Sequence, residues 1–249
     1  ARLPYVRPPG TRLRIHATRG PFSEQLLTAR MRPWGRGIYG DPVWLLPRFY
    51  RPRIRKRWKL GVIPHLSQLA SAALDSPVKP ELRCFEVPPE LAGEVRIITT
   101  RTAISLAAMG ERLDEILACE RIVSVSLHGL VIAEAYGIPC LHFSAGRAAD
   151  LVQVSLAPDQ ALDLRVADLY AGLGLRSRPA YRQPLAAAPD WGAVMAAVDR
   201  AWSPLMLDGD RLLRVFPLEP RPFEPPVPAQ FWCHPLLGAI ALQHRLTAA

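Results

Sequence analysis

Two histidines and two arginines are predicted to lie at the ends of buried strands, and these residue types can hold an anion and move protons. They are His65, His128, Arg19 and Arg101. An imidazole ring gains and loses a proton near neutral pH, so it can act as a general acid or base. A guanidinium group binds a carboxylate or phosphate through paired hydrogen bonds. These side chains would therefore suit an anionic substrate and acid–base chemistry.

The stretch 121–143 is predicted to position His128 at a strand-to-helix turn. Residues 122–125 form a short β-branched run, and residues 130–136 carry apolar side chains at helical spacing. Gly137 is then expected to end the helix before a second strand. His128 would therefore lie at a helix N-terminus that follows a buried strand.

Such a turn is where parallel α/β proteins bind ligands, because the first-turn N–H groups are unpaired and the helix dipole favours an anion. Ser124 and Ser126 add hydroxyl donors there, and Gly129 lets a ligand approach the backbone. The structural alternative is that His128 only caps the turn and the serines satisfy nearby backbone groups. The coincidence of strand, serines, His-Gly and helix favours a site.

Composition narrows the class of protein. The chain has 249 residues, of which 49% are hydrophobic, so it can bury one large or two modest cores. No apolar run reaches the eighteen or so residues that cross a bilayer, and the first residues do not resemble a signal peptide. The four cysteines form no Cys-x-x-Cys pair, which argues against a zinc site or a disulfide framework. We therefore expect a soluble, cytoplasmic protein.

The net charge of +9 points to an anionic partner. The densest basic run, residues 48–59, interleaves arginine and lysine with aromatic residues, as polyanion-binding patches do. We prefer a solvated linker between two domains, because no nucleic-acid-binding signature accompanies the run. Contact with an anionic membrane surface is the remaining alternative.

The other elements are expected to bring the candidate residues to one edge of a sheet. We predict helices over 22–30, 105–119 and 190–202, and strands over 60–64, 83–87 and 95–100. His65, Arg101 and His128 would then follow neighbouring strands, whose ends meet at one crevice in a parallel sheet. Asp41 lies in a Gly-Asp-Pro turn, where it would either brace the turn or take part in the chemistry.

Four motifs resemble the polysaccharide pyruvyl transferase family. The segment Ser124–Pro139 is similar to the family signature, with a Ser-rich strand end, Leu-His-Gly and Gly-Ile-Pro. Arg-Gly-Pro at 19–21, Gly-Asp-Pro at 40–42 and Gly-Val-Ile-Pro-His at 61–65 match further family motifs. The resemblance covers roughly residues 12–175. Many members carry an arginine where this chain has Ser126, which would leave one cation fewer for the substrate.

The resemblance implies an α/β fold of the GT-B type, with two facing Rossmann-type domains and parallel sheets. Residues 1–58 would be an incomplete N-terminal domain with a basic linker, and residues 59–216 the C-terminal domain. Residues 217–249 would form a Pro-rich connector and a C-terminal helix.

The resemblance also implies transfer of pyruvate from phosphoenolpyruvate to sugar hydroxyls as a ketal. The acceptor would be an exopolysaccharide or its lipid-linked precursor, and peripheral contact with the inner membrane face would fit that acceptor. His128 would be the general acid, and His65 or Asp41 the base. The anion would be held by Arg19, Arg101, Ser124, Ser126 and the amides after Gly129. No metal, other cofactor or nucleic acid is expected.

Two alternatives remain open on the residues alone. A GT-B glycosyltransferase using a nucleotide sugar would need a carboxylate for the ribose, and Glu134 is the candidate for that role. A non-catalytic protein could instead bind a polyanion or membrane through residues 48–59.

Overall fold

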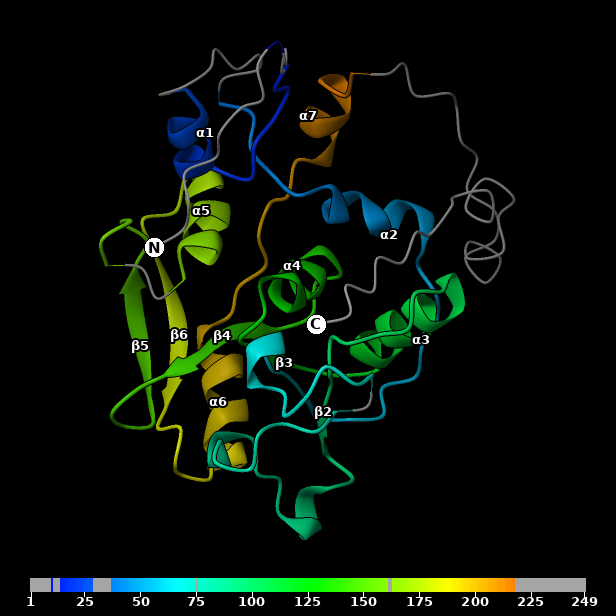
Figure 1. The fold of residues 1–249 in the computed structure, drawn as a ribbon, viewed down its shortest axis with the longest axis vertical. Helices are drawn as coiled ribbons and strands as arrows, with labels where there is room; N and C mark the ends of the chain where they lie inside the picture. Colours follow the sequence, from blue (N-terminus) through cyan, green and yellow to red (C-terminus); the bar gives the residue numbers. More distant parts are fainter. Residues whose placement is uncertain (1–9, 11–13, 29–36, 75, 161–162, 218–249) are drawn as a thin grey trace.

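A mostly parallel six-stranded sheet forms the centre of the protein (Figure 1). The computed structural model describes residues 10, 14–28, 37–74, 76–160 and 163–217. The strands lie in the order β2-β1-β3-β4-β6-β5, and only β5 runs antiparallel to its neighbour. Their bounds are Leu60–Ile63 (β1), Val95–Ile97 (β2), Ile122–Ser124 (β3), Cys140–Ala145 (β4), Asp150–Ser155 (β5) and Ser177–Gln183 (β6). The predicted α/β class is confirmed.

Helices cover both faces of the sheet. The α-helices are α1 Pro21–Thr28, α2 Leu46–Phe49, α3 Leu106–Leu117, α4 Leu127–Ala135, α5 Leu164–Gly172, α6 Trp191–Ala201 and α7 Gly209–Arg214. Short 3-10 turns are η1 Pro42–Leu45, η2 Leu66–Gln68, η3 Arg83–Phe85 and η4 Pro89–Leu91. Buried residues of α3, α4 and α5 share one core cluster, and those of α6 and η3 share the other. The sheet is therefore the middle of three layers.

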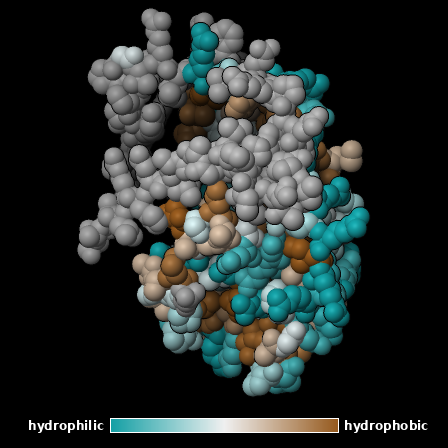
Figure 2. Space-filling model, turned by 90° about the vertical axis from the view of Figure 1, so that its right-hand side faces the viewer, coloured by the Kyte–Doolittle hydropathy of each residue, from teal (hydrophilic) through white to brown (hydrophobic). Residues whose placement is uncertain are grey.

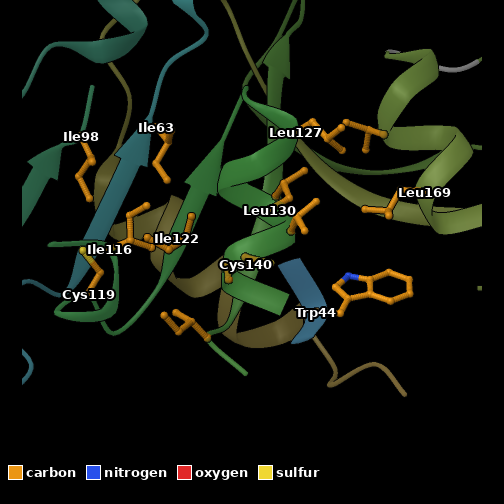
Figure 3. Close-up of a cluster of buried hydrophobic side chains, with 14 of the residues drawn as sticks. Trp44, Ile63, Ile98, Ile116, Cys119, Ile122, Leu127, Leu130, Cys140 and Leu169 are labelled. Carbon is orange, nitrogen blue, oxygen red and sulfur yellow. The ribbon is translucent and has the colours of Figure 1, made fainter. Parts of the chain in front are cut away.

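Successive residues along a strand point to the two cores alternately, because side chains alternate between the two faces of a sheet. Ile63 and Ile122 point to the first core, where they lie beside Leu130 of α4 (Figure 3). Their neighbours Val62 and Val123 lie in the second core with Trp191 of α6. All six side chains are at most 1% exposed, so β1 and β3 are short but completely buried.

Helix α4 is buried on more than its sheet-facing side. Leu130, Val131 and Ala133 are fully buried, and η1 packs against α4 on the side away from the sheet, where Trp44 lies (Figure 3). A helix that is apolar all round must be covered in this way. Residues 42–49 therefore act as an outer layer that holds α4, and the turn before it, in place.

Two sequence predictions for local structure have different outcomes. The helix predicted over 105–119 is α3, whose N-cap Ser105 accepts a hydrogen bond from the Ala108 N–H at 3.1 Å. The strand predicted over 83–87 is wrong, because these residues form the turn η3. Cys84 and Phe85 fill the second core instead of joining the sheet, so their apolar character reflects burial and not strand pairing.

The C-terminal part of the sequence prediction lies largely outside the described residues. The Pro-rich connector and C-terminal helix expected over 217–249 can be followed only at Pro217. Among the residues that the structure describes, none of the helices has the length and apolar composition that crossing a bilayer requires.

A buried histidine in β4 makes stability depend on pH. Burial lowers the pKa of His142 from its usual 6.5 to about 4, although the nearby Asp163 carboxylate opposes the shift. The unfolded chain therefore binds this proton first as the pH falls, and folding loses about 3 kcal/mol between about pH 6.5 and 4. We expect urea unfolding from pH 7 to 4 to show this loss in the wild type and a smaller one in His142→Leu. Equal losses in both proteins would contradict the prediction.

Candidate active site

The strand order creates a crevice between β1 and β3. The chain runs from β1 outwards to β2 and returns through α3 to β3 on the other side of β1. Loops that leave neighbouring strands in opposite directions open a ligand-binding crevice at the strand ends. Ile63 lies opposite Ser124 in the sheet register. The residues that follow each strand, including His65 and Ser126, are therefore placed at this crevice.

A pocket of about 430 Å³ lies there, which we call the switch-point pocket. Its polar walls come from six segments of the chain: Arg19, His65, Thr100, Arg112, Ser126 with His128, and Arg165. Among the residues that the structure describes, no carboxylate lines this pocket. It therefore offers cations and hydrogen-bond donors without a competing negative charge.

His65 is held in one orientation by its own turn. The Ser67 N–H donates to His65 Nδ1 at 3.2 Å, and the Ser67 hydroxyl lies 2.8 Å from the same nitrogen. In return, the Gln68 side chain accepts from the His65 backbone N–H at 2.8 Å. A backbone N–H can only donate, so Nδ1 must be the acceptor. The neutral ring therefore carries its proton on Nε2.

His128 lies in the first turn of α4. Ser126 is the N-cap residue, and its side chain makes no capping hydrogen bond. The first-turn N–H groups are thus not occupied by that hydroxyl, and the helix dipole favours an anion beside them. Gly129 has no room for a side chain, because an added Cβ would lie 2.3 Å from Ser124 Oγ and 2.9 Å from Ile63 Cδ1. The glycine therefore lets α4 pack closely on β1 and β3, and Gly129 itself lines the pocket.

Arg19 reaches the pocket because helix α1 is fixed against α5 (Figure 1). The buried Asp168 carboxylate of α5 accepts from the N–H groups of Phe22 and Ser23 at 2.7 and 3.2 Å, and from the Ser23 hydroxyl at 2.5 Å. Arg19 Nε is buried and has no hydrogen-bond partner among the described residues. A buried donor without a partner costs free energy, so this group is suited to a ligand atom.

The pocket is also lined by two arginines that were not predicted from the sequence. Arg112 of α3 pairs with Glu115, and its Nε is buried without a described partner. Arg165 of α5 binds Asp163 through Nε at 3.2 Å and Nη2 at 2.8 Å. Neither carboxylate lines the pocket, so each fixes its arginine from outside. An Asp-Leu-Arg start to an apolar helical segment was the available signal for Arg165.

The Asp163–Arg165 pair persists into acid. Burial opposes ionisation of Asp163, but hydrogen bonds from the Arg165 side chain and backbone N–H outweigh it and lower the Asp163 pKa to about 2. The carboxylate therefore remains charged at neutral pH. It holds the Arg165 guanidinium at the pocket wall.

The structure places four predicted site residues outside the switch-point pocket, and Glu134 of α4 is one of them. Ser124 is fully buried and donates to the Ser126 carbonyl at 2.7 Å, which braces the turn. Arg101 donates to the Ala72 carbonyl at 2.7 Å, and its neighbour Thr100 lines the pocket instead. The buried Asp41 caps η1 by accepting from the Val43 N–H at 3.0 Å.

Glu134 lies in α4, inside a network of buried side chains. Its carboxylate pairs with Arg178 and accepts from the Tyr170 hydroxyl at 3.0 Å and the Trp202 indole N–H at 3.2 Å. Because these partners satisfy it, Glu134 is not available to a ribose. The network balances a buried guanidinium, which would be costly if left alone.

The basic run 48–59 is tied to the rest of the fold. Lys56 donates to the Leu117 and Cys119 carbonyls at the end of α3, at 2.9 and 2.6 Å. Lys59 pairs with Glu94 at 2.7 Å. These contacts hold part of the run in a defined path along the edge of the fold.

The described residues contain no group of three or more His, Cys, Asp or Glu side chains that could hold a metal ion.

Comparison with known proteins identifies the family. A model of the polysaccharide pyruvyl transferase family matches residues 11–146, which is more than half of the 249 residues. No curated protein and no solved structure matches the chain. The matched region contains Arg19, His65 and His128, and the chain belongs to the polysaccharide pyruvyl transferase family.

Proposed function

We propose that the switch-point pocket binds phosphoenolpyruvate and that the chain transfers its pyruvyl group to sugar hydroxyls as a ketal. One observation carries this proposal: a pocket with three arginines, two histidines and a helix N-terminus, lined by no described carboxylate. Phosphoenolpyruvate carries a phosphate and a carboxylate on three carbons, so it needs several cations close together. The unpartnered Nε groups of Arg19 and Arg112 suit such an anion.

The chemistry requires one proton donor and one proton acceptor. A proton adds to the methylene carbon, and a sugar hydroxyl attacks the adjacent carbon as it loses its own proton. Phosphate then leaves with its bonding electrons, and a second hydroxyl closes the ketal and gives its proton to the departing phosphate. Protonated His65 would be the acid: the Ser67 hydroxyl, 2.8 Å from Nδ1, can accept the hydrogen bond of one ring proton, which leaves Nε2–H to be given up. The exposed His128 side chain makes no hydrogen bond to another described residue, so it can accept a proton. The sequence analysis expected His128 to be the general acid, whereas this proposal makes His128 the base and His65 the acid.

The burial of Glu134 favours phosphoenolpyruvate over a nucleotide sugar as the donor substrate. A ribose is usually recognised by a carboxylate, and the candidate for that role is occupied by Arg178, Tyr170 and Trp202. The tethered basic run likewise gives little support to a purely polyanion-binding protein.

The remaining parts of the proposal concern fold and location. The doubly wound strand order supports one Rossmann-type domain of a GT-B arrangement. We infer an acceptor in a polysaccharide or its lipid-linked precursor. A lipid-linked acceptor would place the reaction in the cytoplasm at the inner membrane face.

A calorimetric titration tests the donor assignment. We expect saturable binding of phosphoenolpyruvate and weaker or no binding of UDP- and GDP-sugars. Arg19→Ala and Arg165→Ala should each weaken the binding of phosphoenolpyruvate by about 10- to 100-fold, because a hydrogen bond to a charged group contributes about 1.5–3 kcal/mol. Arg83→Ala is the control, since Arg83 pairs with Glu86 on the surface. Tighter binding of a nucleotide sugar would refute the assignment.

A further inference from the structure

A second and larger hollow lies next to the switch-point pocket, between helix α3, the edge strand β2 and residues 101–103. We call this hollow, of about 720 Å³, the α3 groove. Figure 2 shows the side of the molecule that is on the right in Figure 1, where α3 lies, and hydrophilic and hydrophobic residues are mixed over its described part. No step proposed above uses this groove.

The polar groups of the groove differ from those of the switch-point pocket. Guanidinium and carboxylate groups both line it, from Arg57, Arg96, Arg101, Glu111 and Glu115. The switch-point pocket has cations without a described carboxylate. A groove with both signs of charge holds a trianion poorly, because its carboxylates repel the ligand. It can instead donate to and accept from the same neutral group.

The indole of Trp58 gives the groove an apolar wall. Arg57 and Arg96 lie over this ring, with their guanidinium carbons 4.9 and 5.5 Å from its centroid. Glu115 also holds Arg96, with Nε 2.7 Å from its carboxylate. Cation–π contacts and the ion pair together limit the motion of these side chains. The groove therefore presents its donors in a preset arrangement.

Besides Arg112, which it shares with the pocket, the groove has a donor of its own without a partner within the described part of the chain. Arg101 gives Nη1 to the Ala72 carbonyl at 2.7 Å, whereas its Nε is buried and unpaired. A native structure seldom leaves such a group without a hydrogen bond. A hydroxyl oxygen from a ligand in the groove would satisfy it.

The groove and the switch-point pocket are adjacent, because helix α3 and the loop after β2 contribute residues to both. Arg112 lines both. Thr100 lines the pocket, and the next residues, Arg101 and Thr102, line the groove. A molecule in the groove therefore lies beside the proposed donor, separated from it by one loop and one side chain.

We propose that the α3 groove binds sugar units of the acceptor, and that this acceptor is a neutral, hydroxyl-rich glycan. A sugar offers hydroxyls that both donate and accept, together with apolar C–H faces. The mixed charges and Trp58 provide for both. This inference rests on the proposed function, because it assumes that a sugar must reach the donor in the neighbouring pocket.

The test is a glycan array of neutral and acidic oligosaccharides, probed with the full chain and followed by calorimetry on the best ligand. We expect a neutral oligosaccharide to bind. Arg101→Ala and Glu111→Ala should each weaken its binding by about 10-fold, since each removes hydrogen bonds. Both variants should bind phosphoenolpyruvate as the wild type does, because neither residue lines the switch-point pocket. Arg83→Ala is again the control.

The outcomes separate the two proposals. Binding of no neutral oligosaccharide, tighter binding of acidic ones, or unchanged affinity in both variants would overturn the assignment of the groove. If phosphoenolpyruvate still binds in those cases, the proposed function stands. If a neutral oligosaccharide binds through the groove and phosphoenolpyruvate does not bind at all, the proposed donor is wrong and the groove assignment stands.

Discussion

Replacing His128 by alanine should lower turnover by about 10²- to 10⁴-fold, the usual contribution of a positioned proton-transfer group. The variant should remain folded, because His128 is exposed and alanine is favourable in a helix. The first-turn N–H groups of α4 also remain. We therefore expect phosphoenolpyruvate to bind with little change while phosphate release in the presence of a mixed oligosaccharide pool falls.

A second histidine variant and a control sharpen this result. His65→Ala should cause a loss of similar size, and the double variant should lose much less than the product of the two, because the residues act in one reaction. His16→Ala is the control, since His16 does not line the switch-point pocket. Undiminished phosphate release by His128→Ala would remove this histidine from the mechanism.

Replacing Gly20 by alanine should detach α1 from α5 and abolish tight donor binding. The added Cβ would lie 1.7 Å from the Asp168 carbonyl oxygen and 2.5 Å from its carbonyl carbon. These are backbone atoms of a buried helical turn, so they cannot move aside as a flexible side chain could. Arg19 would leave the pocket with its helix. We expect a stability loss on the order of 4 kcal/mol, at the upper end for single substitutions.

Denaturant unfolding and donor titration together measure the Gly20→Ala effect. Gly93→Ala is the matched control, because a Cβ at position 93 meets no atom within 4 Å. The control should unfold and bind phosphoenolpyruvate as the wild type does. If Gly20→Ala unfolded at the same denaturant concentration as Gly93→Ala, the packing of residue 20 against Asp168 would not be the anchor of α1.

The sequence predicted those parts of the candidate site that depend on local signals. His65 and Ser126 lie two residues after short buried strands, and His128 lies in the first turn of the helix that follows the second of them. A strand end is visible in the sequence as a break in an apolar run. Arg19 precedes a proline at the start of a helix, which is also a local signal. The structure brings all four to one pocket.

The sequence could not show which predicted residues are held away from the pocket by distant partners or by their own turns. Glu134 and Asp41 have the right chemistry for a site, but partners remote in sequence bury the first, and its own turn occupies the second. Arg112 lies in the middle of a helix, where only the packing of α3 decides whether it reaches the pocket. Arg101 missed the pocket because β2 ends at Ile97 and the following loop turns Thr100 inward instead.

The walls of the switch-point pocket are drawn from segments spread between Arg19 and Arg165, and this spread couples ligand binding to folding. An unfolded chain cannot assemble these groups, so it has no comparable affinity for an anion. Any molecule that occupies the pocket therefore adds its binding free energy to the folded state, about 2.7 kcal/mol at a concentration one hundred times its Kd. For a domain with a net stability of about 5–15 kcal/mol, the supply of substrate would then help to set how long the protein survives.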